Sequence, residues 1–137
     1  MRKEKTIKNI FLILFISLFY SCMFDEYNTS TIINNSNRNI EVKIELNKET
    51  YKSSLDRLKN INGGLIKVYD TINMEAKYSL SPKEELQLDF KRGRIPNLKD
   101  FKKISIYDND TIVLDNESKI NLAFEKQWRN KFVLEIK

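Results

Sequence analysis

The sequence predicts an all-β fold in which about eight short strands form two antiparallel sheets that pack face to face, with one short helix. Apolar and polar residues alternate in many segments, and this period of two places the apolar side chains on one face of a strand. Turn-forming residues separate the segments. So many short strands cannot bury their apolar faces in one open sheet, and two packed sheets are therefore expected.

The clearest alternation predicts five strands. In residues 40–46, a charged residue follows each of the first three aliphatic residues. We expect one face of each such strand to be core and the other to be solvated. The same period recurs in residues 72–80, 86–90, 120–124 and 132–136.

Shorter runs of β-branched or aromatic residues predict the remaining strands. These runs are residues 65–70, 104–107 and 111–114, and residues 31–33 are expected to open the set. The chain is expected to reverse at residues 81–83, 108–110 and 115–117, which are rich in Asp, Asn, Ser and Pro.

One segment has the helical period instead. Within residues 48–61, Tyr51, Leu55, Leu58 and Ile61 recur at a spacing of three or four. Residues 62–64 are Asn-Gly-Gly, which tolerate positive φ and end a helix. We therefore predict a short helix over 48–61, and either one helical turn or a loop over 96–101.

The first 21 residues have the order of regions found in a signal peptide. Four basic residues and one acid precede an apolar run over residues 10–20 that only Ser17 interrupts. This run is about half the length that a helix needs to cross the hydrocarbon core. A cleaved signal is therefore the better interpretation than a permanent membrane span.

Ser21 and Cys22 indicate where the signal is cut and how the mature chain is held. A small residue directly before the only cysteine is where a lipoprotein signal peptidase cleaves beside an acylated thiol. Phe19 and Tyr20 depart from the usual lipobox. We expect palmitate-type acyl chains on Cys22 to hold the protein at a membrane; the alternatives are a free cysteine after an ordinary signal peptide, or an uncleaved anchor.

These features divide the chain into a signal peptide (1–21), a lipidated tether (22–28) and one β-sandwich domain (29–137). We expect an outer-membrane lipoprotein on the periplasmic face or the cell surface. Asp25 and Glu26 resemble the acidic tether that sends such lipoproteins to the surface, and they also fit an ordinary polar tether.

Composition limits the partners of the mature domain. Residues 1–21 hold four of the 24 basic and one of the 19 acidic residues of this 137-residue chain, so the net charge falls from +5 to +2 without them. A near-neutral, exported domain excludes nucleic acid as a partner. With Cys22 lipidated, no thiol remains for a disulfide, and the domain must rest on its apolar core.

Three phrases carry a resemblance to a family. They are the Asn-Asn-Ser turn at 34–36 before strand 40–46, segment 96–101 before Ile104-Ser105-Ile106, and Asn-Asp-Thr-Ile-Val-Leu at 109–114. Together they resemble small, largely uncharacterised β-sandwich lipoproteins of Bacteroidota-type bacteria. The resemblance implies an immunoglobulin-like sandwich and an envelope location, and it brings no catalytic residues.

Residue types exclude most catalytic chemistry. The chain has no histidine, which removes Ser-His, Cys-His and His-ligated metal schemes. No serine is followed three residues later by lysine. We therefore expect no enzyme and no cofactor other than the lipid on Cys22, with a carboxylate-based hydrolase as the remaining exception.

Candidate ligand contacts each have a structural alternative. Asp108, Asp110 and Asp115, with Asn109 and Asn116, are the nearest approach to a calcium cage, but the same residues suit turns.

A basic loop that includes Arg92 and Arg94 can meet lipid phosphates or an acidic partner, or simply be solvated. Trp128 can stack on a sugar or cover one end of the sandwich.

Elimination leaves a non-catalytic binding or interaction module of the cell envelope, with a protein or glycan partner. The alternatives are a structural or accessory subunit of an envelope assembly, whose exposed apolar or edge-strand surface another chain covers, and a glycan-hydrolysing protein with two facing carboxylates.

Overall fold

The computed structural model describes residues 27–92, 98–127 and 130–137, without the side chains of residues 50–55, 91 and 92. Its elements are β1 (Tyr27–Asn34), β2 (Ile40–Leu46), η1 (Lys48–Thr50), α2 (Tyr51–Asn60), β3 (Asn62–Gly63), β4 (Leu65–Asp70), β5 (Glu75–Leu80), β6 (Glu85–Arg92), β7 (Phe101–Tyr107), β8 (Thr111–Leu114), α3 (Glu117–Ala123), β9 (Glu125–Lys126) and β10 (Lys131–Ile136).

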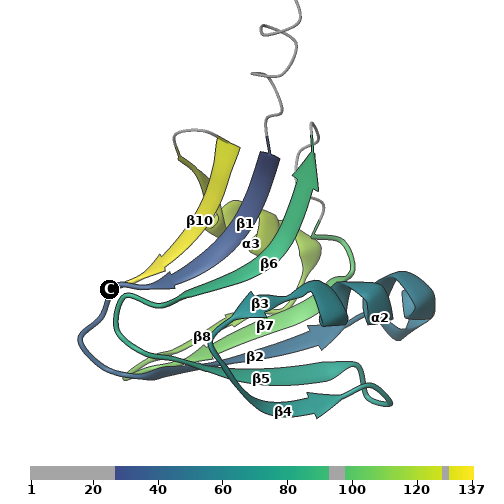
Figure 1. Ribbon diagram of the computed structural model, residues 1–137, viewed down its shortest axis with the longest axis horizontal. Coiled ribbons are helices and arrows are strands. Elements are labelled where there is room, and N and C mark those ends of the chain that lie inside the picture. The colour runs from purple at the N-terminus through teal and green to yellow at the C-terminus, as the bar shows by residue number, and fades with distance from the viewer. Residues whose placement is uncertain (1–26, 93–97, 128–129) are drawn as a thin grey trace, which may run out of the picture.

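The strands form two five-stranded sheets, which confirms the predicted all-β, two-sheet sandwich (Figure 1). We call the sheet with the order β3-β6-β1-β10-β9 sheet A, and the sheet with the order β4-β5-β2-β7-β8 sheet B. All pairings are antiparallel except that of β1 with β10. The first and last strands therefore lie side by side at the centre of sheet A.

The core lies between the two sheets, and the inward-facing residues of the alternating segments contribute to it. Ile40, Val42, Ile44 and Leu46 of β2 are buried, and the charged residues between them face outward. Strand β5 behaves in the same way, with Ala76, Tyr78 and Leu80 buried. These two central strands of sheet B thus confirm that period-two segments present one face to the core.

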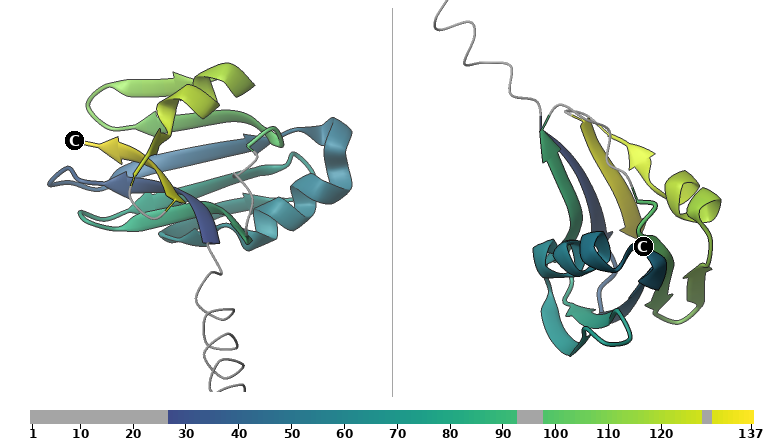
Figure 2. Two further views of the ribbon diagram at one scale, coloured as in Figure 1. Left: turned by 90° about the horizontal axis from the view of Figure 1, so that it is seen from above. Right: turned by 90° about the vertical axis from the view of Figure 1, so that its right-hand side faces the viewer.

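The predicted helix over 48–61 is confirmed as η1 followed by α2. Leu58 and Ile61 are buried in the core, and the helix lies beside one end of the two sheets (Figures 1 and 2). The chain then turns at Gly63, where φ is +100° and a Cβ would collide with the carbonyl oxygen of Glu85. Only glycine fits there, and it lets β3 pair with β6.

The strand predicted over 120–124 is wrong, because these residues belong mostly to α3. Asn116 is the N-cap, and its Oδ1 accepts a hydrogen bond from the backbone N–H of Lys119 at 2.9 Å. Ile120 and Phe124 are buried, whereas Leu122 is exposed. Residues four apart share a helix face, so the apparent alternation also satisfies the helical period.

The prediction that Phe90 faces the core is also wrong. The pairing of β1 with β6 shifts between Ser30 and Thr31, so that Ser30 pairs with Asp89 and Thr31 with Gln87. Leu88 is the extra residue of this bulge, and beyond it the inward and outward positions exchange. Asp89 is therefore buried and Phe90 is 55% exposed.

Ile72, which the alternation assigned to a strand, lies in the turn before β5. The Oδ1 atom of Asp70 accepts hydrogen bonds from the backbone N–H groups of Ile72 and Asn73, both at 2.9 Å. Met74 then adopts a φ of +57°. This Asp-centred turn leaves Ile72 on the surface and delays the strand to Glu75.

Candidate functional site

The most unusual surface of the molecule is an exposed apolar edge on sheet B. Strand β4 ends the order of that sheet, and every residue from Leu65 to Tyr69 is exposed. With the neighbouring turn residue, its apolar side chains are between 42% and 83% exposed. We call this surface the β4 edge and define it as Leu65, Ile66, Val68, Tyr69 and Ile72.

The β4 edge is apolar on both faces of the strand. Ile66 pairs with Tyr78 and Tyr69 with Ala76, both buried partners, so Ile66 and Tyr69 lie on the core side of the strand although both are exposed. Leu65 and Val68 pair with Ser79 and Lys77 on the outer side. Lys67 is the extra residue of a bulge between Ile66 and Val68, a feature that hinders addition of another strand.

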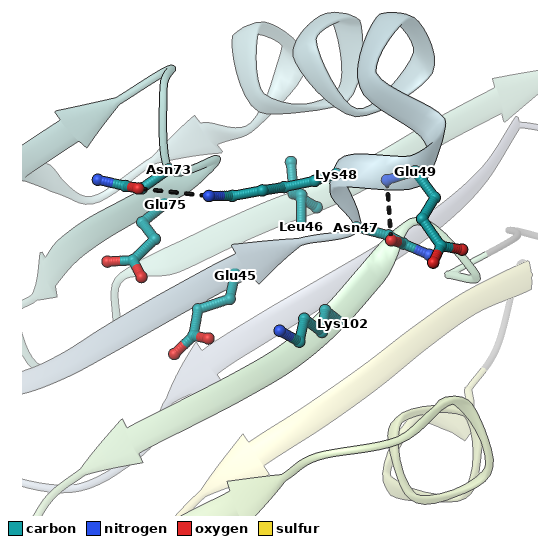
Figure 3. Close-up of a pocket in the computed structure, with 8 residues that line it drawn as sticks. All are labelled: Glu45, Leu46, Asn47, Lys48, Glu49, Asn73, Glu75 and Lys102. Carbon is teal, nitrogen blue, oxygen red and sulfur yellow. Dashed lines mark hydrogen bonds between the residues drawn. The ribbon is translucent and has the colours of Figure 1, made fainter.

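A second candidate is an open polar groove of about 360 Å³ where β2 runs into η1 (Figure 3). Lys48 reaches across it, and its Nζ donates a hydrogen bond to Asn73 Oδ1 at 3.3 Å. Three acids, two lysines, two asparagines and one apolar residue line the groove: Glu45, Glu49, Glu75, Lys48, Lys102, Asn47, Asn73 and Leu46.

Two of the three carboxylates of this groove, those of Glu45 and Glu75, form ion pairs with Lys43. Glu45 and Glu75 are direct partners on β2 and β5, so both side chains lie on the outer face of sheet B. The Nζ atom of Lys43 is 3.0 Å from Glu45 Oε1 and 3.1 Å from Glu75 Oε2. The hydrogen bonds to Glu45 and then to Glu75 raise the pKa of Lys43. Lys43 thus neutralises much of the negative charge of this pair of carboxylates.

A third cluster is buried beneath α2. Arg57 forms ion pairs with Asp89 of β6 and with Asp100, whose Oδ2 is 3.4 Å from Arg57 Nη2. All three side chains are at most 9% exposed, and the guanidinium lies 5.7 Å from the ring centroid of Phe101. The cluster ties the helix to both sheets. Its burial keeps it from solvent, so we assign it a structural role.

Of the three candidate cation ligands, Asp108 and Asp115 each accept hydrogen bonds from a different basic side chain. Asp108 accepts hydrogen bonds from Arg38, with Oδ1 2.5 Å from Nε and Oδ2 3.2 Å from Nη2. Asp115 accepts one from Lys119 Nζ at 2.8 Å. Asp110 is exposed in the turn between β7 and β8. Within the described residues, no group of three or more acidic or thiol side chains is arranged to hold a metal ion.

Other predicted site residues lie outside the described part of the chain. They are the cleavage residue Ser21, the lipid-attachment residue Cys22, Arg94 and Trp128, while Arg92 is described as the last residue of β6 without its side chain. Among the described residues, no helix combines the length and the apolar composition needed to cross a bilayer. These predictions therefore stay predictions.

Sequence reasoning found β4 as a strand but missed its edge as a surface. The available signal was its broken alternation, because Leu65-Ile66 and Val68-Tyr69 are adjacent apolar pairs on either side of Lys67. Such a run puts apolar side chains on both faces, which suits either a fully buried strand or an exposed binding strand. Only the position of β4 at the margin of the sheet distinguishes the two.

Comparison with known proteins adds no relative: no family model matches the sequence, and no curated protein and no solved structure is significantly similar to it.

Proposed function

We propose that this chain is an exported lipoprotein, anchored through acyl chains on Cys22, and that its sandwich is a non-catalytic module that binds a protein of the cell envelope. The observation that carries the binding role is the β4 edge. Soluble proteins seldom leave several neighbouring aliphatic side chains this exposed, and such patches commonly mark protein interfaces.

The chemistry of the β4 edge favours a protein over a glycan. Four of its five residues are aliphatic, and Tyr69 is its one aromatic residue. Sugar rings are bound by aromatic faces flanked by hydrogen-bonding groups, whereas Leu65, Ile66 and Val68 offer neither. A partner surface that covers them would gain from the burial of apolar area.

The interface would use side chains on two sides of a strand margin. The bulge at Lys67 disfavours simple strand addition, so the partner is expected to pack against side chains and not to extend sheet B. Lys67 and Asp70, one of each sign on the same strand, would lie at the rim of such an interface and set its orientation.

A non-catalytic role agrees with the chemistry of the described residues. Glu45 and Glu75, two of the three acids that line the groove, are paired with Lys43. The outer membrane, on its periplasmic face or at the cell surface, is the location that the signal peptide and Cys22 support.

The anchor is tested by intact mass measurement of the protein from a native membrane fraction, next to Cys22→Ala. We expect a diacyl or triacyl adduct on an N-terminal Cys22, and loss of both the adduct and the membrane attachment in the variant. An unmodified or uncleaved N-terminus would contradict the lipoprotein assignment.

The binding role is tested by site-specific photo-cross-linking in intact cells from position 65. We expect one product of defined mass, identified by peptide mass spectrometry, that disappears when Val68→Lys and Ile72→Lys are added. Position 122, equally apolar and 80% exposed on α3, is the matched control. Equal cross-linking from positions 65 and 122, or a product that survives the lysine substitutions, would remove the β4 edge as the interface.

A further inference from the structure

A pair of exposed aromatic side chains lies at the end of sheet A from which the chain leads toward Cys22. Tyr27 opens β1, and the ring of Phe90 on β6 stacks on its ring with a centroid distance of 4.7 Å and an interplanar angle of 16°. Tyr27 is 43% exposed and Phe90 is 55% exposed. Stacking on each other therefore leaves much of both rings in contact with solvent.

The β-bulge of sheet A is the reason that this pair exists. An unbroken alternation would have turned Phe90 toward the core, and the shift between Ser30 and Thr31 turns Asp89 inward in its place. The carboxylate of Asp89 then meets Arg57 in the interior. The fold thus places a charged residue inside at this point and an aromatic ring outside.

Basic residues continue from the aromatic pair. Lys91 and Arg92 complete β6, where they pair with Asn28 and Tyr27, so both belong to the same end of sheet A. The neighbouring acid, Asp89, is buried in its ion pair with Arg57. Positive charge at the same end of a domain as exposed aromatic rings is the combination that binds the interface of an anionic bilayer.

Chain length brings this end close to the proposed anchor. Five residue steps separate Cys22 from Tyr27, so the two lie at most roughly 18 Å apart even when the chain is fully extended. The start of β1 and the end of β6 lie at the top of Figure 1, whereas β4 lies at the bottom, and the right-hand view of Figure 2 agrees. A lipid on Cys22 would hold the aromatic end near the bilayer and the β4 edge away from it.

We infer that the end of the sandwich formed by Tyr27, Phe90, Lys91 and Arg92 docks on the surface of an anionic phospholipid bilayer, and so orients the β4 edge away from the membrane. The aromatic rings enter the interface, and the positive charge that Lys91 and Arg92 bring to this end of sheet A favours an anionic surface. This inference rests on the proposed lipid anchor, because the short link to Cys22 is what brings the surface to the bilayer.

The test uses the full chain purified from membranes and reconstituted in vesicles of phosphatidylcholine with about 30% phosphatidylglycerol, a content that gives an anionic surface. The lipids carry bromine on their acyl chains, which quenches nearby tryptophan. Phe90→Trp is made in a Trp128→Phe background, and Ile72→Trp in the same background is the control at the β4 edge. Tyr27→Trp is a second reporter if Phe90→Trp does not fold by circular dichroism.

We expect tryptophan at position 90 to lose about half of its emission, because an interfacial side chain reaches roughly 5 Å into the headgroup and acyl boundary, and tryptophan at position 72 to lose almost none. Adding Lys91→Gln and Arg92→Gln should lower the equilibrium constant for docking, as measured by quenching at position 90, by about an order of magnitude. Lys67→Gln with Lys77→Gln removes the same charge elsewhere and should leave this constant unchanged.

Flotation of the same vesicles separates the two ideas. Protein that floats without quenching at positions 90 and 27, or with equal quenching at position 72, keeps the anchor and overturns the docked orientation. Protein that does not float overturns the anchor, and the docked orientation with it.

Discussion

The turn at Asn34 and the β4 edge both lie at margins of the sandwich, but the turn buries a polar side chain and the edge exposes apolar ones. Asn34 is fully buried: its Nδ2 donates to the carbonyl oxygens of Arg38 at 2.7 Å and Leu80 at 2.9 Å, and its Oδ1 accepts from the N–H and hydroxyl of Ser36. The β4 edge exposes aliphatic side chains. Hydrogen-bond partners and neighbouring strands, and not hydropathy alone, therefore decide which side chains are buried.

This comparison teaches where stability and binding reside. Buried polar side chains with satisfied hydrogen bonds hold the margins together, because removal of one partner leaves others without compensation in the interior. Exposed apolar side chains add little to the folded state and remain available to a partner. Substitutions in the two kinds of region should consequently have very different effects on the free energy of unfolding.

The largest effect is expected for Arg57→Met. The variant keeps the volume of the side chain and removes the cation between Asp89 and Asp100, so it should lower the free energy of unfolding by about 4 kcal/mol. Urea denaturation measures the loss, and Lys59→Met on the exposed side of α2 is the control. A loss equal to that of Lys59→Met would mean that the buried ion pairs do not stabilise the folded protein.

Asn34→Ala should lower the free energy of unfolding by somewhat less, about 3 kcal/mol. It removes four side-chain hydrogen bonds, and the buried Leu80 carbonyl oxygen loses the Asn34 side chain as a donor. Asn35→Ala is the matched control, since the hydrogen bond of Asn35 to Ile136 uses the backbone N–H that alanine keeps. If urea denaturation gave the same loss of unfolding free energy for both variants, the Asn34 turn would not differ from an ordinary surface turn.

The same two regions show what the sequence could predict. Alternation over residues 40–46 and 76–80 identified core strands correctly, because the period of two depends only on local geometry. It failed at Phe90 and over 120–124. The bulge that exposes Phe90 arises between two strands far apart in sequence, and the helix α3 depends on the cap at Asn116, since Ile120 and Phe124 fit both periods.

The candidate surfaces were less predictable than the fold. The β4 edge depends on which strand ends sheet B, and the Tyr27–Phe90 pair depends on the bulge, so neither can be read from local pattern. The three candidate cation ligands are close in sequence, but Arg38 from another turn pairs with Asp108, and Lys119 pairs with Asp115. The Arg38 pairing is tertiary, whereas the Lys119 pairing joins residues four apart and accompanies the helix α3 that alternation missed.

A smaller, pH-dependent effect is expected where Arg38 and Asp108 connect two turns. The hydrogen bond from Arg38 lowers the pKa of Asp108 below its usual value, so the folded state binds that proton less readily than the unfolded state. The contribution is therefore present above the unfolded value of about 3.9 and is lost as the pH falls through the folded value.

A double-mutant cycle with Arg38→Gln and Asp108→Asn, followed by urea denaturation across this range, should give a coupling that disappears toward low pH. A coupling that grew on acidification would contradict this assignment.

The smallest effect on stability is expected at the β4 edge itself. Ile66→Thr should change the free energy of unfolding by less than about 0.5 kcal/mol, because its side chain is 54% exposed in the folded protein. Ile44→Thr, the same substitution on the same sheet at a fully buried position, should cost more than about 2 kcal/mol. If Ile66→Thr were as costly as Ile44→Thr, the edge would belong to the core. If it left stability intact and abolished cross-linking from position 65, its exposed apolar side chains would be explained by a partner and not by the fold.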